Sequence, residues 1–256
     1  MRIYSYNVNG IRAALTKGLA DWITREQPDV LCLQETKAQP EQIDQALFER
    51  LGYQGYYYSA DKKGYSGVAV LCKQTPRQVT YGMGIPEYDA EGRALRVDFD
   101  QVSILCVYVP SGTSGEVRQA FKMEFLSRFA GYIAQLRKSH PNLLVCGDYN
   151  IAHEERDINH PERQIGVSGF LPEERQWLTE FISTGMIDTF REYDPRPEQY
   201  SWWSYRGGAR SRNAGWRIDY LLAAEPLRSN LKGAGICQQA VHSDHCPVFV
   251  ELDFKA

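Results

Sequence analysis

Short apolar runs and amphipathic segments follow one another along most of the chain. Residues 29–35 and 143–150 each contain four consecutive apolar residues, which is the pattern of a strand buried on both faces. Residues 94–99 and 102–109 are separated by a short polar link and predict a hairpin. Further strands are predicted at residues 3–8, 53–59, 67–73, 200–204, 217–223 and 247–252.

Longer amphipathic segments lie between these runs and predict helices. They cover residues 15–25, 40–51 and 116–138, and a further helix begins at Pro172, because proline is favoured in the first helical turn. Strands outnumber helices, and no linker, repeat or low-complexity segment divides the chain. The pattern therefore predicts an α/β fold in which two packed β-sheets are flanked by helices, within one domain over residues 1–256.

The composition narrows the class of protein. No stretch approaches the roughly 18 consecutive apolar residues of a membrane span, and the N-terminus lacks the apolar region of a secretion signal. Four of the six cysteines lie inside apolar runs and are interpreted as small core residues: Cys32, Cys72, Cys106 and Cys146. Because no Cys-x-x-Cys pair is present either, we expect a protein of the reducing cytoplasm that has no membrane partner.

The net charge of −3 gives no overall attraction to nucleic acid, so a site for a polyanion would need local positive charge. Residues 199–218 contain no acidic residue and carry four arginines: Arg206, Arg210, Arg212 and Arg217. Trp202 and Trp216 lie in the same stretch. Arginine binds phosphate and aromatic rings accept bases or sugars, which favours a DNA contact. The alternative is a solvated turn whose tryptophans belong to the core.

Residues able to bind a cation or move a proton occur at the ends of several predicted strands. They are Asn7, Asn9, Glu35, Asp148, Asn150, Asp219, Asp244 and His245. Asp148 and Asn150 share a side if their strand continues through both, and otherwise they form an Asx turn. Strands can lie side by side and bring their ends together, so this many polar endings indicate one shared site.

Most of these candidate ligands are oxygen atoms, which suit Mg²⁺ or Mn²⁺ better than Zn²⁺. We therefore expect a divalent-metal site that hydrolyses a phosphodiester, with Glu35 as the principal metal carboxylate. Asp148 is the candidate base, and Asn150 is placed to hold the attacking water. His245 is the candidate donor to the phosphate, with Asp219 as the carboxylate that orients it.

Tyr108 adds a hydroxyl group that can lie beside the phosphate. Each of these residues also has a purely structural interpretation. Glu35 could cap the following helix, Tyr108 could be a core aromatic with a hydrogen-bonded tip, and Asp219 could form an ion pair with Arg217.

Eight short segments carry a more specific signal and span nearly the whole chain: residues 7–13, 33–37, 64–68, 108–110, 147–153, 169–175, 215–220 and 243–247. Among them are Gly-Asp-Tyr-Asn at residues 147–150 and Ser-Asp-His at residues 243–245. With these segments the chain resembles the exonuclease III family of apurinic/apyrimidinic (AP) endonucleases, within the endonuclease/exonuclease/phosphatase superfamily.

The resemblance implies a four-layered α/β sandwich and a Mg²⁺-dependent enzyme, with Mn²⁺ as a substitute, that cuts double-stranded DNA on the 5′ side of an abasic site. It also implies 3′–5′ exodeoxyribonuclease and 3′-phosphodiesterase activity on blocked 3′ ends. It implies metal contacts by Asn7, Glu35, Asp148, Asn150, Asp244 and His245. Catalytic roles are implied for Tyr108, Asp148, Asn150, Asp219 and His245.

The same resemblance implies DNA contacts by Arg12, Tyr65, Trp202, Arg206, Arg210, Arg212 and Trp216. Trp202 and Trp216 match positions that wall a pocket for the flipped abasic sugar. The chain departs from the human type at Val167, where that type has asparagine, and at residues 111–114. It also lacks the long N-terminal extension of the human type, so a bacterial, monomeric protein is expected.

Two other functions are alternatives to a DNA-repair nuclease. The first is a phosphoesterase of the same superfamily that acts on a substrate other than DNA, and the arginine-rich segment at residues 199–218 argues against it. The second is a DNA-binding protein without catalysis. A binding module needs neither a base nor an amide that positions water, so the complete catalytic set argues against that function: Glu35, Asp148, Asn150, Asp219 and His245.

Overall fold

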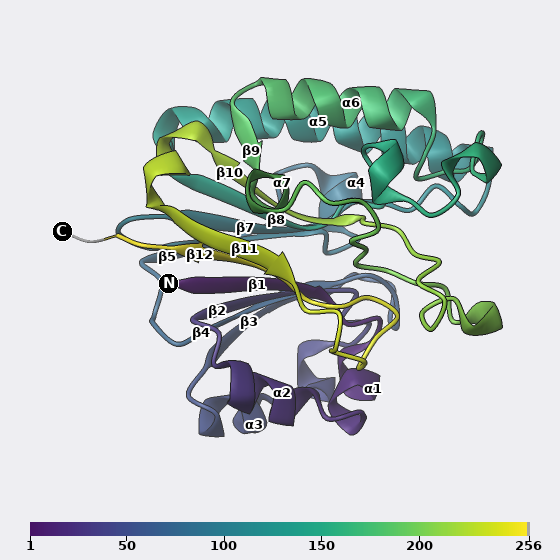
Figure 1. The fold of residues 1–256 in the computed structure, drawn as a ribbon. Helices are drawn as coiled ribbons and strands as arrows, with labels where there is room; N and C mark the ends of the chain where they lie inside the picture. The colour runs from purple at the N-terminus through teal and green to yellow at the C-terminus, as the bar shows by residue number, and fades with distance from the viewer. Residues whose placement is uncertain (255–256) are drawn as a thin grey trace.

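The structure, a computed structural model, describes residues 1–254 and contains two six-stranded β-sheets packed face to face (Figure 1). The first sheet has the order β11-β12-β1-β2-β4-β3. Its strands are β1 (Arg2–Asn7), β2 (Val30–Gln34), β3 (Gln54–Tyr58), β4 (Val68–Cys72), β11 (Leu231–Ile236) and β12 (Val248–Leu252). The second sheet has the order β5-β6-β7-β8-β10-β9. Its strands are β5 (Gln78–Tyr81), β6 (Ala94–Asp98), β7 (Ser103–Tyr108), β8 (Leu143–Asp148), β9 (Met186–Asp188) and β10 (Asp219–Ala224).

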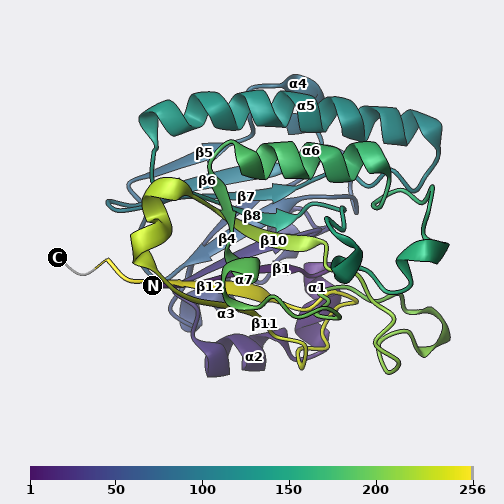
Figure 2. The same cartoon turned by 45° about the horizontal axis from the view of Figure 1, so that its top comes forward.

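Helices cover the outer face of each sheet, as the two views in Figures 1 and 2 show. The first sheet carries α1 (Ile11–Thr16), α2 (Leu19–Glu26) and α3 (Gln45–Arg50). The second carries α5 (Glu116–Ser139) and α6 (Pro172–Ser183), and the short helices are α4 (Pro86–Asp89) and α7 (Thr189–Tyr193). Both sheets are mixed, because β1–β2 and β7–β8 are parallel pairs among antiparallel ones. The predicted four-layered α/β sandwich is confirmed.

The apolar runs that predicted doubly buried strands divide their side chains between two cores. In β2, Val30 and Cys32 face the core between the sheets, whereas Leu31 and Leu33 face the helices on the outside. β8 follows the same rule: Cys146 faces the core between the sheets, whereas Leu143 and Val145 face α5 and α6. A strand between two layers loses the alternation of polar and apolar residues, which explains the uninterrupted runs.

The cysteines behave as core residues. Cys32, Cys72, Cys106 and Cys146 all lie in the core between the sheets, and all six cysteines of the chain are free thiols. This confirms the interpretation of the four cysteines in apolar runs as small hydrophobic residues. Nowhere in residues 1–254 is there a helix with both the length and the apolar surface needed to cross a membrane.

Some predicted elements differ from the structure. The strand predicted at residues 200–204 is absent, because Trp202 alone forms isolated bridges, to Trp216 and to His245. The helix predicted at residues 15–25 is two helices, α1 and α2. Gly18, with a φ of 90°, separates them in a left-handed conformation that glycine adopts without strain.

Several elements carry too weak a signal to be predicted. β9 has three residues, and α4 and α7 have four and five. β11 contains Gly233 and Gly235, which weaken a strand pattern, and β5 lies at the edge of its sheet. The helix predicted at residues 40–51 is a 3₁₀ turn followed by α3, which begins after its N-cap residue Asp44.

A buried ion cluster fixes the segment that leads into β10. Arg217 is 1% exposed and donates two hydrogen bonds to Asp157, of 2.7 and 3.1 Å. It also donates to Asp188 at 2.8 Å, and Arg191 donates to Asp157 as well. Burial opposes the ionisation of Asp157, but the guanidinium groups of Arg217 and Arg191 outweigh it and hold the pKa of Asp157 well below its usual range.

We expect Asp157→Ala to lower the free energy of unfolding by about 3 kcal/mol, because it removes the carboxylate that pairs with Arg191 and leaves the buried guanidinium of Arg217 with Asp188 alone. The contribution of a carboxylate with a depressed folded pKa is complete above the unfolded pKa of about 3.9 and is lost as the pH falls through the folded value. Urea unfolding at pH 7 and pH 3 measures both effects. Glu124→Ala breaks an exposed i,i+4 pair and serves as the control with little change. A variant of Asp157 as stable as the wild type would contradict this assignment.

Candidate active site

Strand ends from both sheets converge on one point. β7 ends at Tyr108 and β8 at Asp148, and these residues are register partners. Asp219 begins β10 and lies opposite Asp148 on its other side. In the first sheet β1 ends at Asn7, and Glu35 directly follows β2. The shared site predicted from the polar strand endings is therefore present as an arrangement in space.

Asn7 connects the two sheets. Its Nδ2 donates to Glu35 Oε1 at 2.9 Å and to Asp148 Oδ2 at 2.8 Å, and its Oδ1 accepts from the backbone N–H of Asn9 at 3.0 Å. The amide oxygen is thus turned away from the two carboxylates. Asn7 thus holds Glu35 and Asp148 together, and the metal contact that the resemblance implies for it stays a prediction.

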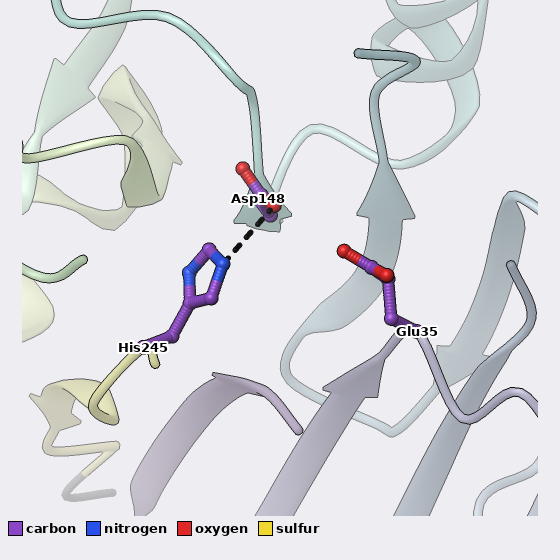
Figure 3. A group of neighbouring side chains, drawn as sticks. All are labelled: Glu35, Asp148 and His245. Atoms are coloured by element: carbon purple, nitrogen blue, oxygen red, sulfur yellow. Dashed lines mark ion pairs between the residues drawn. The ribbon is translucent and has the colours of Figure 1, made fainter. Parts of the chain in front are cut away.

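Glu35, Asp148 and His245 form a group that can hold a metal ion, and Figure 3 shows their side chains pointing toward one another. One ligand atom from each lies within 4.8 Å of the others, and within residues 1–254 this is the one such group of His, Cys, Asp and Glu side chains. Two of the three donors are carboxylates, which suits a hard cation such as Mg²⁺ or Mn²⁺. The residues present therefore fit the divalent metal predicted from the sequence.

Glu35 is not a helix cap. Its Oε2 lies 2.7 Å from Lys37 Nζ, and α3 is capped by Asp44. Burial opposes the ionisation of Glu35, but the Lys37 ammonium and the hydrogen bond from Asn7 outweigh it and lower its pKa. Glu35 is therefore an anion at neutral pH, as a metal carboxylate must be.

Asp148 has the opposite electrostatic environment. It is 1% exposed, and burial together with the charge of Asp219 and that of Glu35 raises its pKa, although His245 opposes the shift. A carboxylate with a raised pKa is a stronger base than one in water. The environment supports Asp148 as the group that accepts a proton.

His245 and Asp219 form the pair that the sequence suggested. His245 Nδ1 lies 2.9 Å from Asp219 Oδ2, and its Nε2 faces Asp148 at 3.9 Å. Burial lowers the pKa of His245, but the carboxylates of Asp219 and Asp148 outweigh it and raise that pKa. Ser201 Oγ donates to Asp219 Oδ2 at 2.6 Å, a contact that no sequence pattern signals. An ion pair of Asp219 with Arg217 is excluded, because Arg217 binds Asp157 and Asp188.

Asn150 lies just beyond the strand. Its φ of 52° is left-handed and β8 ends at Asp148, so the strand does not continue through both residues. An Asx turn brings them together, because Asn150 N donates to Asp148 Oδ1 at 2.8 Å. Asn150 Nδ2 donates to Val109 O at 2.9 Å and lies 3.4 Å from Asp148 Oδ2. The amide is thus fixed beside the candidate base.

Asp244 lies outside the group that can hold a metal. Its Oδ1 accepts from Asn9 Nδ2 at 3.0 Å and its Oδ2 accepts from Trp202 Nε1 at 3.1 Å. Both oxygens are therefore engaged in positioning neighbours. Asp244 thus orients Trp202, and the metal contact that the resemblance implies for it stays a prediction.

A cleft of about 290 Å³ opens beside these residues. Trp202 and Trp216 line it at half-buried positions, with ring centroids 5.9 Å apart and planes at 86°. The two rings are thus not core residues, whereas Trp203 is buried. Tyr108 lines the polar side, where burial and the charge of Glu35 keep its pKa well above its usual value, so its hydroxyl is protonated and can donate. The other lining residues are Glu35, Ser111, Thr113, Asp148, Asn150, Val167, Ser168, Gly169, Ile218, Asp244 and His245.

The arginines of residues 199–218 divide into two kinds. Arg206 and Arg212 are exposed and free to contact a polyanion. Arg210 donates to the carbonyls of Ser243, Gln238 and Ala240 and stacks over Trp203, so it has a structural role, and its predicted DNA contact stays a prediction. Arg217 is neutralised by Asp157 and Asp188, which lie in segments distant from it in the sequence.

Two further predicted DNA contacts lie outside the cleft lining. Arg12 is exposed in the first turn of α1. Tyr65 is half-buried, and its hydroxyl accepts from Arg93 at 3.0 Å and from Arg118 at 2.6 Å. Arg93 also donates to the backbone carbonyl of Tyr108, so this network supports one side of the site. Neither arginine was a candidate in the sequence, because Arg93 lies in the link before β6 and Arg118 lies in α5, away from the polar strand endings.

Comparison with known proteins gives consistent matches. The sequence matches the Endonuclease/Exonuclease/phosphatase family over residues 4–245. It is 42% identical over 250 residues to the exodeoxyribonuclease of Bacillus subtilis, covering 97% of this chain and 98% of that protein. It is 38% identical over 259 residues to the DNA-(apurinic or apyrimidinic site) endonuclease of Dictyostelium discoideum, covering 100% and 71%. Its structure is similar to that of a Neisseria 3′ phosphatase bound to a product DNA hairpin, with a TM-score of 0.92, 26% identity and coverage of 99% and 100%.

Proposed function

The chain belongs to the endonuclease/exonuclease/phosphatase family, and we propose that it is a DNA-repair nuclease that hydrolyses the phosphodiester on the 5′ side of an abasic site. Exonuclease and end-cleaning activity at 3′ ends belongs to the same proposal. Its relatives are named as an exodeoxyribonuclease and as an AP endonuclease, and a similar structure is a 3′ phosphatase bound to DNA.

The observation that carries the proposal is the placement of Glu35, Asp148 and His245 on one cleft that two tryptophans wall. A base, a metal carboxylate and a donor to phosphate are the groups that in-line hydrolysis of a phosphodiester requires. A protein that only binds DNA has no use for a buried carboxylate whose pKa is raised. The catalytic function is therefore favoured over a binding function.

The roles follow from the contacts. Asp148 accepts the proton of the attacking water, which the Asn150 amide can orient because that amide is fixed next to the carboxylate. His245, held by Asp219, presents Nε2 toward the cleft as a donor to the phosphate oxygens. Tyr108 can donate from the other side of the same cleft. Asn7 holds the carboxylates of Glu35 and Asp148 at fixed positions relative to each other, because its amide donates to both.

Mg²⁺ is the metal that we propose, with Mn²⁺ as a substitute, held by Glu35 with Asp148 and His245 next to it. Such an ion polarises a phosphoryl oxygen and offsets the negative charge that develops on it. Lys37 lies against Glu35 Oε2 and already supplies one positive charge to this edge of the site.

The cleft also suggests why an abasic nucleotide is the substrate. A nucleotide without a base costs less to extrude from the duplex than an intact one. Trp202 and Trp216 contact each other edge to face and line the cleft, and a cleft of about 290 Å³ suits a bare sugar better than a sugar that carries its base. Exposed Arg206 and Arg212 extend from the same segment and can hold the DNA backbone.

The decisive test compares four substrates for the wild-type enzyme: a duplex with one abasic analogue, the same duplex intact, a duplex with a blocked 3′ end, and a soluble phosphomonoester. We expect incision 5′ to the abasic analogue, trimming of a 3′-blocked end, and loss of both with EDTA. Preferred hydrolysis of the soluble ester would favour the alternative, a phosphoesterase with a substrate other than DNA. Activity that EDTA leaves intact would refute the metal-dependent mechanism.

We expect Glu35→Ala to weaken binding of Mn²⁺ by at least about tenfold, because it removes one of the two carboxylates at the site. Isothermal titration calorimetry with Mn²⁺ measures the affinity, and high Mg²⁺ should partly restore incision. Asp244→Ala is the matched comparison and should weaken the affinity less, since its oxygens already accept from Asn9 and Trp202. An unchanged affinity in Glu35→Ala would remove Glu35 from the metal site.

A further inference from the structure

A buried lysine touches the site from behind without lining the cleft. Lys122, on α5, has a side chain that is 0% exposed. Its Nζ donates to Glu174 Oε1 on α6 at 2.5 Å and to the backbone carbonyl of Asn150 at 2.8 Å. A buried ammonium is strongly unfavourable unless it is paired and hydrogen-bonded, so the positions of these two partners are tightly constrained.

Glu174 extends the contact to the wall of the cleft. Its Oε2 accepts from the backbone N–H of Gly169 at 2.6 Å and from that of Leu171 at 3.0 Å. Gly169 lines the cleft with a φ of 96°, and a Cβ at this position would lie 2.9 Å from the Trp216 ring and 3.1 Å from Asn150 O. The Gly169 turn is thus packed directly between the tryptophan wall and the turn that carries Asn150.

We propose that the Lys122–Glu174 ion pair is a positioning device for the reaction, which fixes the Asn150 turn and the Gly169 turn relative to each other. Lys122 acts through the carbonyl of Asn150, and Glu174 acts through the amide of Gly169. The pair therefore sets where the water-orienting amide lies relative to the Trp216 wall. This inference rests on the proposed function, because it assigns the pair a role in that reaction.

Two physical arguments favour positioning over simple stabilisation. A buried ion pair contributes little net stability compared with apolar residues of the same volume, so the pair is a weak device for holding a fold together. The left-handed turn at Asn150 is less favourable than extended backbone and needs contacts that hold it. Both Asp148 and Asn150 must keep their places to within a fraction of an ångström, because a misplacement of about 1 Å can cost about a hundredfold in rate.

The test is a double-mutant cycle. Lys122→Met keeps the length of the side chain and removes the ammonium, and Asn150→Gly removes the amide while glycine adopts the positive φ without strain. We expect Lys122→Met to lower kcat on the abasic duplex by about tenfold to a hundredfold, with KM changed by less than about threefold. In the Asn150→Gly background the same substitution should cost less than about threefold, since the amide it positions is gone.

Arg96→Met is the matched control. Arg96 is also a buried cation, paired with Asp98 and Thr80, and none of these three lines the cleft. It should lower the melting temperature and leave kcat within about twofold. If Lys122→Met lowers kcat by the same factor in both Asn150 backgrounds, or lowers only the melting temperature, the positioning role is refuted.

Two further measurements keep the outcomes separate. The double variant Lys122→Met/Glu174→Gln removes both charges, so it folds even where one unpaired charge would not, and it should show the same loss of kcat. Amide hydrogen exchange of residues 148–152 and 168–172 should become faster in each variant, whereas exchange in β2 should not change. Unchanged exchange in both segments would overturn the positioning role. A wild-type enzyme that fails to cut abasic DNA would refute the proposed function, while the exchange result would still decide whether the pair holds the two turns.

Discussion

Asp148→Asn should lower the turnover of abasic DNA by at least about a hundredfold, as expected for removal of a general base. The substitution keeps the size of the side chain and removes its charge. The remaining amide oxygen can still accept from the Asn150 N–H, whereas an amide nitrogen cannot accept from Asn7 as the carboxylate does. Steady-state kcat and KM on a duplex with one abasic analogue provide the measurement, and DNA binding should be retained.

Asp148 belongs to the group that can hold a metal, so its role as a base must be distinguished from a role as a metal ligand. A lost metal ligand is rescued in part by more metal, whereas a lost base is not. We therefore expect the defect of Asp148→Asn to persist at saturating Mg²⁺, in contrast to that of Glu35→Ala. Asp98→Asn is the control, because Asp98 is another buried carboxylate of the second sheet, at the end of β6 away from Tyr108. Turnover within a few-fold of the wild type in Asp148→Asn would exclude it as the base.

The sequence could predict those parts of the site that depend on local pattern. Glu35 and Asp148 each follow an apolar run, and a run of that kind places its last residue at a known edge of a buried strand. The pairing of His245 with Asp219 was predictable because each residue belongs to a recognisable short motif. What the pattern could not give is which partner each polar atom binds, since that depends on register between strands far apart in the chain.

Asn7 and the arginines illustrate that limit. Asn7 was expected to contact the metal, yet its amide nitrogen bridges two carboxylates from different sheets. Arg210 and Arg217 looked like free positive charge because residues 199–218 contain no acidic residue. In the fold, Arg210 donates to backbone carbonyls, and Arg217 forms ion pairs with Asp157 and Asp188. Charge counted along the sequence overstates a basic surface when long-range partners neutralise it.

Long-range contacts also explain why some strands were not predicted from the sequence. β9 and β11 lack a hydrophobic signal of their own and are strands because a neighbouring strand offers them hydrogen bonds. Trp202 shows the opposite error, since an aromatic segment typical of a strand forms isolated bridges and leaves its ring half-exposed in the cleft. Tertiary context overrides β-propensity at both places.

The pairing of His245 with Asp219 leads to a second large effect. His245→Ala and Asp219→Ala should each lower kcat by about a hundredfold or more, as for loss of a preorganised donor to the developing charge. Asp219 favours the protonated, donating form of His245 and fixes its ring through the 2.9 Å contact to Nδ1. Without Asp219 the pKa of His245 falls, so the remaining activity should be lost at a lower pH than in the wild type.

If the two residues act as one unit, the variant with both alanines should be little worse than the poorer single variant, because coupled groups are not additive. The measurements are kcat for the four members of the cycle across pH, with melting temperatures to confirm folding. An NMR titration of His245 in wild type and in Asp219→Ala gives a reading independent of activity. Ser201→Ala removes the hydrogen bond to Asp219 Oδ2 and the acceptor of the Ile218 and Asp219 backbone N–H groups, and it should produce a smaller loss of the same kind. Fully additive losses, with an unchanged His245 titration, would mean that Asp219 and His245 act separately and that the carboxylate serves Asp148 instead.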